Sequence, residues 1–429
     1  MFRFTYLWRA LLPLFIAAFV IDPLPTHAEP WEFEAKTGLN YDFISHDYYL
    51  RTLDTLGLTP DSLLELKSYS DKIDEGGGWL RLELEHQGPV KLAVATRIYL
   101  TNEKFRSVLD FDARWQSLRL LSSTDLKSYS SDEDFSLYDR QVRNSSRLGL
   151  ALLNSEQHYV EVSQEIEYIG YRDADPDISG YYQSESRLRL RQQLGSFSDL
   201  DMSLRFDLRD YQESSELDFN RWVGDINWTR IASRGYYHGA LYLERRDYDA
   251  VDSGDDYTCV SPEFTFDRSL TGQLALAPEL RLHYYHYDHE DYATFSNLRF
   301  EGKLLMKYQY RLLSAFEFGL GSERFAASDN LYDDQDYNSW QLLAGYETFS
   351  HSWLTLTLDA QYGHRDYLSD SDGYYTDYNF LRFDLLADIA FSKWISLSLI
   401  GGTDLEYHSD QEDNVFLHLF SANLTYKIY

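Results

Sequence analysis

Segments in which polar and apolar side chains alternate with a two-residue period dominate this chain and indicate β structure. In the clearest one, 201–209, the alternation is unbroken: Met202, Leu204, Phe206 and Leu208 fall on one side, and Asp201, Ser203, Arg205, Asp207 and Arg209 on the other. Successive side chains of a strand point to opposite faces, so this pattern predicts a strand whose two faces meet different surroundings. Segments 186–194 and 80–85 repeat the pattern.

The links between such segments differ in length in a regular way. Counting back from residue 429, the segments predicted as strands are approximately 414–429, 395–408, 378–391, 353–367, 337–350, 313–326, 296–311, 273–288, 257–270, 236–248, 220–231, 200–211, 180–194, 158–172 and 138–153. Short links alternate throughout with long links, and every long link contains acidic residues. Short turns on one rim and long polar loops on the other are typical of transmembrane antiparallel up-and-down β-barrels. A soluble β-sandwich, the alternative, has no reason to segregate link lengths.

Residues 1–28 are predicted to be a secretory signal peptide. Arg3 and Arg9 lie in its basic start, the apolar run 10–21 follows, and Thr26-His27-Ala28 places small residues at both positions that determine cleavage. The apolar run is about a dozen residues, short of the roughly 20 that a membrane-spanning helix needs, so a retained anchor is the less favoured alternative. Residues 29–429 are then expected to form a single barrel domain.

Composition and charge limit the partners of this chain. It has 39 Lys and Arg against 70 Asp and Glu, and without Arg3, Arg9 and Asp22 the mature chain has 37 against 69, a net charge of −32. No nucleic-acid partner is therefore expected. Aromatic residues make up 16% of the chain, which suits strands with rings at a boundary between water and lipid. The single cysteine, Cys259, cannot form an internal disulfide.

In these patterns the chain resembles the outer-membrane β-barrel proteins of Gram-negative bacteria, and in size it is similar to the porins. The resemblance extends over nearly all of the mature chain. It includes a C-terminal segment with alternating apolar residues and an aromatic end, namely Phe420, Ala422, Leu424, Tyr426 and Ile428, followed one place out of phase by Tyr429. The resemblance implies an outer-membrane location, contact with membrane lipid and lipopolysaccharide, and insertion by the barrel assembly machinery. It leaves a homo-oligomer open.

The number of strands follows from topology. An even barrel with both ends on one side needs an odd number of strands before residue 138. Four candidates are present, 31–44, 79–87, 90–100 and 107–121, and we predict that three of them are strands, giving about 18 in all, with 16 as the alternative.

Two further upstream segments are predicted not to be strands. Segment 45–76 is predicted as a helical or loop insert, because Leu63, Leu64 and Leu66 follow Pro60-Asp61. Segment 122–137 is polar and acidic, and it is predicted as a solvated loop, with a constriction loop folded into the lumen as the alternative.

Motifs that carry chemistry are missing from the mature sequence: it has no Gly-rich phosphate loop, no metal-spaced Cys/His set and no nucleophile motif. His283 and His289 share a strand face but lie about 20 Å apart at roughly 3.3 Å per residue, so they cannot hold one ion together. With His286, Tyr284, Tyr285 and Tyr287 they are expected to form part of an aromatic girdle. Asp173, Asp175 and Asp177 imitate a calcium loop whose later positions do not match. We predict no enzyme, no cofactor and no metal.

The candidate functional surface is the polar face of two neighbouring segments. We expect eight charged side chains to line the lumen, namely Arg187, Arg189, Arg191, Arg205, Arg209, Asp201, Asp207 and Glu185. On the opposite face, Met202, Leu204, Phe206 and Leu208 are expected to contact lipid. Arginine stays charged, so the five arginines, which we call the ladder, are predicted to favour anions, with a charge-balanced wall as the alternative.

A barrel of about 18 strands has a lumen too wide for side chains to fill. The first functional hypothesis is therefore a channel for passive passage of small hydrophilic solutes. The second is a conduit for export of an acidic polysaccharide along the arginines, and the third is a structural or scaffold barrel of the outer membrane.

Overall fold

The computed structural model describes residues 31–52, 65–88, 90–101, 104–129, 141–155, 157–171, 180–212, 217–249, 256–289, 295–328, 335–368, 376–408 and 414–427. These residues form one sheet of 20 strands. Their bounds are β1 Trp31–Thr52, β2 Glu65–Gln87, β3 Val90–Thr101, β4 Lys104–Trp115, β5 Leu118–Tyr129, β6 Gln141–Ser155, β7 His158–Tyr171, β8 Tyr181–Gln193, β9 Ser198–Tyr211, β10 Phe219–Ala232, β11 Gly235–Tyr248, β12 Tyr257–Ser269, β13 Leu274–Tyr287, β14 Asn297–Arg311, β15 Ser314–Ala327, β16 Tyr337–His351, β17 Leu354–Tyr367, β18 Tyr378–Ala390, β19 Ile395–His408 and β20 Val415–Lys427.

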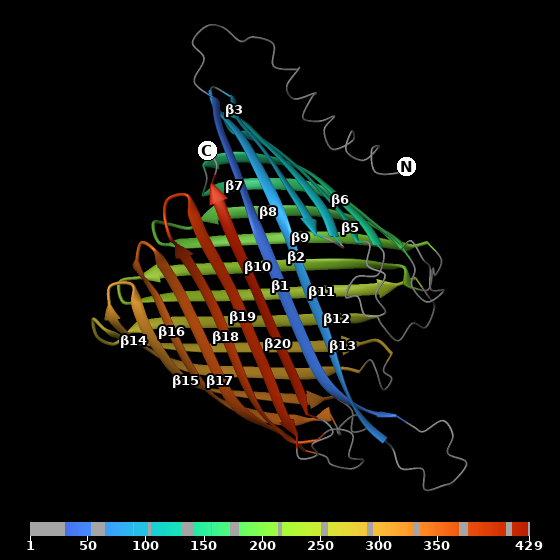
Figure 1. Cartoon of the computed structure of the whole chain (residues 1–429), viewed down its shortest axis with the longest axis vertical. Helices are drawn as coiled ribbons and strands as arrows, with labels where there is room; N and C mark the ends of the chain where they lie inside the picture. The colour runs from blue at the N-terminus through green and yellow to red at the C-terminus, as the bar shows by residue number, and fades with distance from the viewer. Residues whose placement is uncertain are drawn as a thin grey trace.

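Each strand pairs antiparallel with the next one in the chain, and β20 pairs with β1, so the sheet closes on itself (Figure 1). The closing register runs from Lys36 opposite Lys427 to Asp47 opposite Phe416. The strands of the front and back walls cross in the view of Figure 1, because strands in a closed sheet tilt against the barrel axis. The predicted fold class, an antiparallel up-and-down β-barrel, is confirmed.

The strand number is 20 rather than 18 or 16. All four upstream candidates contain strand, and the fourth, 107–121, is two strands separated by a tight turn at Gln116 and Ser117. Gln116 adopts a positive φ of 53° there. A turn without Gly, Pro, Asn or Asp carries little sequence signal, which explains why β4 and β5 were read as one.

Two predicted loops are therefore wrong in part. Residues 122–129 belong to β5, and residues 45–52 and 65–76 belong to β1 and β2, so no helix is present over 65–73. Hydrogen bonding between β1 and β2 continues to Thr52 opposite Glu65 and outweighs the weak helical pattern of this segment. Residues 53–64 and 130–137 lie outside the described residues, as do the predicted signal peptide, Asp173, Asp175, Asp177, Ile428 and Tyr429.

The alternation of link lengths predicted downstream of residue 138 is confirmed. One rim, here the short-turn rim, has links of two to four residues: 88–89, 116–117, 156–157, 194–197, 233–234, 270–273, 312–313, 352–353 and 391–394. The other, the long-loop rim, has the links 53–64, 102–103, 130–140, 172–180, 212–218, 249–256, 288–296, 328–336, 368–377 and 409–414. Only the link at 102–103 is short on that rim, and Trp31 and Lys427 both lie at the short-turn rim.

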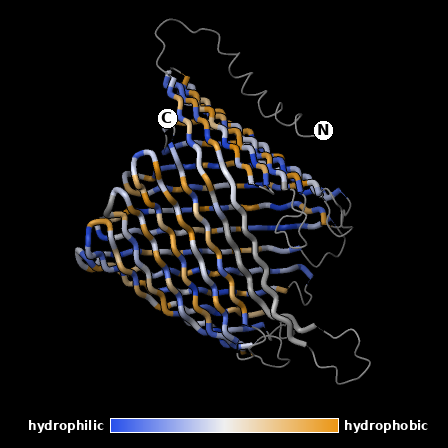
Figure 2. Tube along the Cα trace, in the orientation of Figure 1, coloured by the Kyte–Doolittle hydropathy of each residue, from blue (hydrophilic) through white to orange (hydrophobic). Residues whose placement is uncertain are grey.

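The two faces of the sheet differ in polarity, and the alternation along each strand is visible in Figure 2. On one face large apolar side chains are half-exposed, for example Leu148, Leu204 and Leu320 at 58%, 47% and 60%. On the other face polar side chains crowd together, and Asp207 is fully buried. Side chains diverge on the convex side of a curved sheet and converge on its concave side, so the apolar face is the outer wall and the charged face the inner wall. None of the described residues forms a helix long and apolar enough to cross a membrane.

Candidate functional site: the inner wall of the barrel

The strand register brings the predicted lumen residues together. Directly paired residues share a face of a sheet, and Glu185, Arg187 and Arg191 of β8 lie opposite Asp207, Arg205 and Asp201 of β9. Arg189 and Arg209 follow on the same face because side chains alternate. All eight predicted residues therefore lie on one face of two neighbouring strands, and Met202, Leu204, Phe206 and Leu208 lie on the other.

Most arginines of this ladder have polar partners. Nη2 of Arg189 lies 2.5 Å from a carboxylate oxygen of Asp201, and that of Arg205 lies 3.4 Å from Asp225. Arg209 donates to the side-chain oxygen of Gln183 at 2.6 Å and stacks on a ring of Tyr181, 4.3 Å from the ring centroid. Among the described residues, no carboxylate lies within 4.0 Å of the nitrogens of the other two, Arg187 and Arg191.

Counting both strands, the inner face of β8 and β9 carries five arginines and four carboxylates, the latter being Glu185, Asp199, Asp201 and Asp207. The net charge of this inner face is therefore small. A charge-balanced wall describes this part of the barrel better than a ring of free arginines.

A larger excess of positive charge lies on β3 to β6, where the sequence interpretation placed no site. This positive side has nine inward cations against three carboxylates, Lys91, Arg97, Lys104, Arg106, Arg114, Arg119, Lys127, Arg143 and Arg147 against Asp110, Asp112 and Asp125. Besides these three carboxylates, Glu167 and Glu161 of β7 pair with Arg143 and Arg147, so nine cations meet five carboxylates and an excess of positive charge remains. Reading β4 and β5 as one strand followed by a loop hid the pattern.

An excess of negative charge lies on β15 to β19. This negative side has eight inward carboxylates against two arginines, Glu317, Glu323, Glu347, Asp359, Asp384, Asp388, Asp404 and Glu406 against Arg365 and Arg382. In a closed ring of 20 strands, β5 and β15 are ten strands apart. The positive side and the nearer strands of the negative side, β15 and β16, therefore face each other across the lumen.

At the long-loop rim the inner wall carries an aromatic belt. Its members are Tyr181, Tyr211, Phe219, Tyr248, Tyr257, Tyr287, Phe325, Tyr337, Tyr367 and Tyr378, and neighbouring rings lie 5.4 to 5.6 Å apart in pairs such as Tyr181–Tyr211, Phe219–Tyr248 and Tyr337–Tyr367.

Arginines bridge the rings of this belt from one strand pair to the next. Arg365 lies 4.0 Å from the ring centre of Tyr337 and 5.2 Å from that of Tyr378. Phe219, Tyr337 and Tyr378 are only 5%, 8% and 5% exposed. Their ring faces are thus covered by protein, and the belt is a structural element of the rim rather than a stacking surface for a ligand.

Acidic residues close several long loops by capping the preceding strand. One carboxylate oxygen of Asp218 accepts a hydrogen bond from the backbone N–H of Tyr211 at 2.6 Å, and Asp256 accepts one from Tyr248 at the same distance. Asp336 and Asp377 cap Ala327 and Tyr367 in the same way. Each acid comes directly before an inward aromatic residue of the next strand, so part of the acidic character of these loops is structural.

The histidines singled out in the sequence lie on different faces. His283 points inward, 2.8 Å from the hydroxyl of Ser261, whereas His286 is on the outer face with Tyr284. Tyr285 and Tyr287 also point inward, so the expected girdle is wrong for His283 and for these two tyrosines. The cysteine, Cys259, is buried at 1% exposure beside them.

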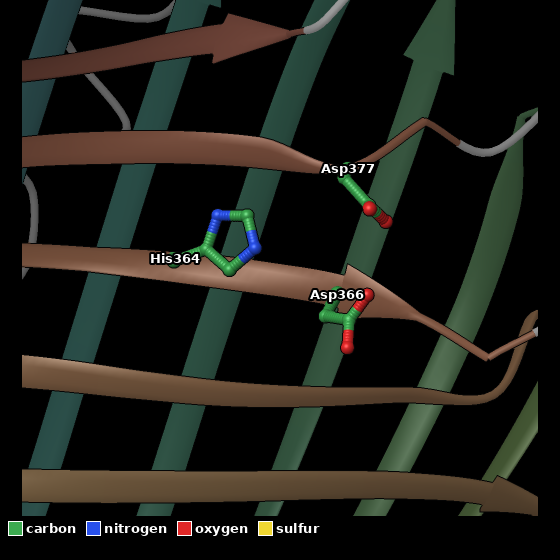
Figure 3. A group of neighbouring side chains, drawn as sticks. All are labelled: His364, Asp366 and Asp377. Carbon is green, nitrogen blue, oxygen red and sulfur yellow. The ribbon is translucent and has the colours of Figure 1, made fainter.

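One group of three side chains at the long-loop rim has the residue types of a metal site. Ligand atoms of His364, Asp366 and Asp377 lie within 4.8 Å of one another (Figure 3). One oxygen of Asp377 already caps the N–H of Tyr367 at 2.8 Å. The group is therefore explained in part by a strand cap, and its geometry alone does not identify an ion.

Residues Leu424 and Tyr426 of the predicted C-terminal signal are 41% and 51% exposed, on the same face as Phe420. Their register with β1 and β19 shows that this segment closes the barrel.

No protein-family model and no curated protein sequence matches this chain. Among solved structures, the chain is similar to the siderophore receptor PirA from Pseudomonas aeruginosa, with a TM-score of 0.51 and 8% identity over 92% of this chain and 80% of that chain. It also aligns with OpdQ from Pseudomonas aeruginosa (TM-score 0.48, 11% identity, 92% and 98% coverage) and with OccAB4 from Acinetobacter baumannii (0.45, 12%, 94% and 100%). At these identities the similarity describes the large barrel fold and no more.

Proposed function

We propose that this chain is an outer-membrane channel through which small hydrophilic solutes pass by diffusion. The observation that carries the proposal is the accessibility of the inner wall. Even in ion pairs, the side chains of Arg143, Arg189 and Arg299 keep 42%, 35% and 43% of their surface exposed. Eight strands already leave just enough room for side chains, so 20 strands enclose space for water beside these charges.

The outer wall supports the membrane location. Half-exposed leucines and aromatic residues would meet lipid there, which is the arrangement of outer-membrane barrels. In this proposal the signal peptide directs export, the barrel assembly machinery inserts the chain, and the outer wall contacts lipid and lipopolysaccharide. The short-turn rim faces the periplasm and the long-loop rim the exterior. No reaction and no cofactor are part of the proposal.

Opposed charges give the proposed channel its selectivity. The positive side attracts anionic groups and the negative side cationic groups, so a solute that carries both is oriented across the lumen. Anion attraction is assigned to β3–β6 more than to the arginines of β8 and β9, because the latter are nearly balanced by their carboxylates.

A second candidate is export of an acidic polysaccharide. It is favoured by one observation, the excess of positive charge given by nine cations on four adjacent strands of the barrel wall. A polyanion would follow this surface while the negative side repels it.

Conductance of the purified protein in a planar bilayer tests the channel. Open ohmic steps are expected, and silence would favour a closed conduit or a scaffold barrel. Topology is tested with a tag inserted near Asp333 and labelled on intact cells. Labelling only after permeabilisation would overturn the proposed orientation.

A further inference from the structure

Uncharged polar side chains gather on one part of the outer wall. On β5 to β8, from the middle of the strands toward the long-loop rim and apart from Ser128 at the rim itself, seven outward positions carry hydroxyl or amide side chains: Ser122, Thr124, Asn144, Ser146, Gln164, Ser184 and Ser186. We call these seven residues the polar patch. On the next strand the four central outward positions, Met202, Leu204, Phe206 and Leu208, are all apolar.

The polar patch consists of two neighbouring parts, one on β5 and β6 and one on β7 and β8, with Leu148 and Ile166 between them. Thr124 lies opposite Ser146, and Gln164 opposite Ser186. The side-chain amide of Gln164 donates to the hydroxyl of Ser184 at 2.8 Å, and its oxygen accepts from Ser186 at 2.6 Å. Asn144 and Ser122 form no hydrogen bond with any other described residue. Asn144, Ser146, Gln164 and Ser186 are all exposed.

Asn144 lies opposite Tyr168, level with an outward aromatic pair, and the other members of the patch lie on the membrane side of that pair. Tyr168 and Tyr182 face outward with ring centroids 4.8 Å apart, as in the girdle that marks the boundary between water and lipid. Ser184 and Ser186 follow Tyr182 toward the short-turn rim by roughly 7 and 13 Å at about 3.3 Å per residue. If the barrel spans the membrane as proposed above, the patch faces the hydrocarbon layer, where unpaired amides and hydroxyls are costly.

The chemistry of the patch limits what covers it. Among the described outward positions of β5 to β8 there is no Lys, Arg, Asp or Glu, so the phosphates of a lipid find no cation there. Hydroxyl and amide groups both donate and accept hydrogen bonds, so the patch is complementary to itself. Leu148 and Ile166, each 58% exposed, lie among its members and add apolar contact area.

We infer that the polar patch is the contact between two copies of this chain in the membrane, and this inference rests on the proposed membrane location. In a two-fold contact the same surface meets itself, so each donor of one copy finds an acceptor on the other. Uncharged polar side chains stabilise contacts between membrane segments in this way. The sequence leaves a homo-oligomer open, and this inference assigns the polar patch as its contact surface.

The test replaces the patch by lipid-compatible side chains. In a variant with Asn144→Leu, Gln164→Leu and Ser186→Leu, loss of the oligomer is expected, measured as the protein mass of the detergent-solubilised particle by light scattering. The matched control, Leu342→Ala on the outer wall of β16, is expected to keep the oligomer. A parent protein that is monomeric at all detergent concentrations, or a triple variant that stays oligomeric, would overturn the inference.

Cross-linking in native membranes provides a second measurement. Ser186→Cys is expected to give a disulfide-linked dimer on mild oxidation, whereas Leu342→Cys, at the sixth position from the long-loop end of its strand as Ser186 is in β8, is not. Cys259 is buried and does not compete. Adducts of Ser186→Cys with a different protein would assign the patch to another partner and contradict the inference.

The two proposals can fail separately. A monomeric variant that still conducts leaves the proposed channel intact, whereas a folded parent that does not insert into vesicles contradicts the proposed function itself.

Discussion

Asp207 is fully buried on the inner wall, and its Oδ2 lies 2.5 Å from Nη2 of Arg221 on the next strand. The same guanidinium lies 3.9 Å from Glu244 of the strand after that. A buried carboxylate with a single close cation makes this pair the most sensitive point of the inner wall. We predict that Asp207→Asn lowers the free energy of unfolding by about 3 kcal/mol, because it leaves Arg221 without its close partner.

The matched control is Asp201→Asn, whose parent carboxylate pairs with Arg189 and is 26% exposed. Water screens that pair, so its loss is expected to cost at most about 1 kcal/mol. Urea unfolding in detergent, followed by tryptophan fluorescence, measures both. Equal losses of unfolding free energy in the two variants would contradict the prediction that Asp207 contributes more to stability than Asp201.

A charged side chain placed on the outer wall is expected to impair insertion into the membrane. Leu204 is 47% exposed on the outer wall, and Leu204→Arg is expected to lower the stability of the inserted barrel by about 2 to 4 kcal/mol if this residue lies near the membrane midplane. Gln361→Arg, on the inner face of β17 near Asp359, is the control and is expected to insert like the parent. Normal insertion of Leu204→Arg together with failure of Gln361→Arg would mean that the faces are reversed.

Selectivity is expected to shift in opposite directions when the two sides of the lumen are neutralised. Lys91, Arg97 and Lys127 changed together to Gln should lower the ratio of anion to cation permeability, and Glu347, Asp359 and Asp388 changed to their amides should raise it. Reversal potentials in a salt gradient measure both ratios.

The differences between these variants should shrink as salt rises, because the Debye length falls from about 10 Å at 0.1 M to about 3 Å at 1 M. Arg187, Arg189 and Arg191 changed to Gln should shift the ratio less than the β3–β6 variant. If the permeability ratio shifts more in the variant of Arg187, Arg189 and Arg191, the side chains that attract anions lie on β8 instead.

The acidic caps predict a local effect at the long-loop rim. Asp218→Ala removes the acceptor of the Tyr211 N–H and is expected to cost about 0.5 to 1.5 kcal/mol. Hydrogen exchange at the Tyr211 amide should quicken while that of central β9 amides stays unchanged. Asp210→Ala, one residue before Tyr211, is the control, and equal exchange in both variants would argue against the cap.

The sequence was sufficient for those features that depend on neighbouring residues alone. The two-residue period assigned Arg189 and Leu204 to opposite faces, and turn residues marked nearly every link after residue 138. The turn at Gln116 and Ser117 contains no Gly, Pro, Asn or Asp, so its sequence signal is weak, and the sequence predicts one strand where the structure has β4 and β5.

Features that depend on the register between strands could not be predicted from the sequence. Which carboxylate neutralises which arginine is decided by pairing between strands, so the near balance of β8 and β9 was not visible from the spacing of Arg187 and Arg191. The opposition of the positive side to β15 and β16 of the negative side depends further on the number of strands, because only a ring of 20 puts β5 across from β15. The polar patch spans four strands, and no single segment shows more than two of its members.

Closure of the sheet through β1 and β20 also has a consequence for the order of folding. Nineteen of the strand pairings join neighbours in the chain and can form as local hairpins, whereas the seam joins Lys36 to Lys427, about 390 residues away. Contacts between residues so far apart carry the largest loop-closure entropy and form slowly. Until they form, β1 and β20 are two unpaired edges, open to pairing with other chains. The slowest step of assembly, and the one most exposed to aggregation, is therefore expected to be the meeting of the first strand with the last.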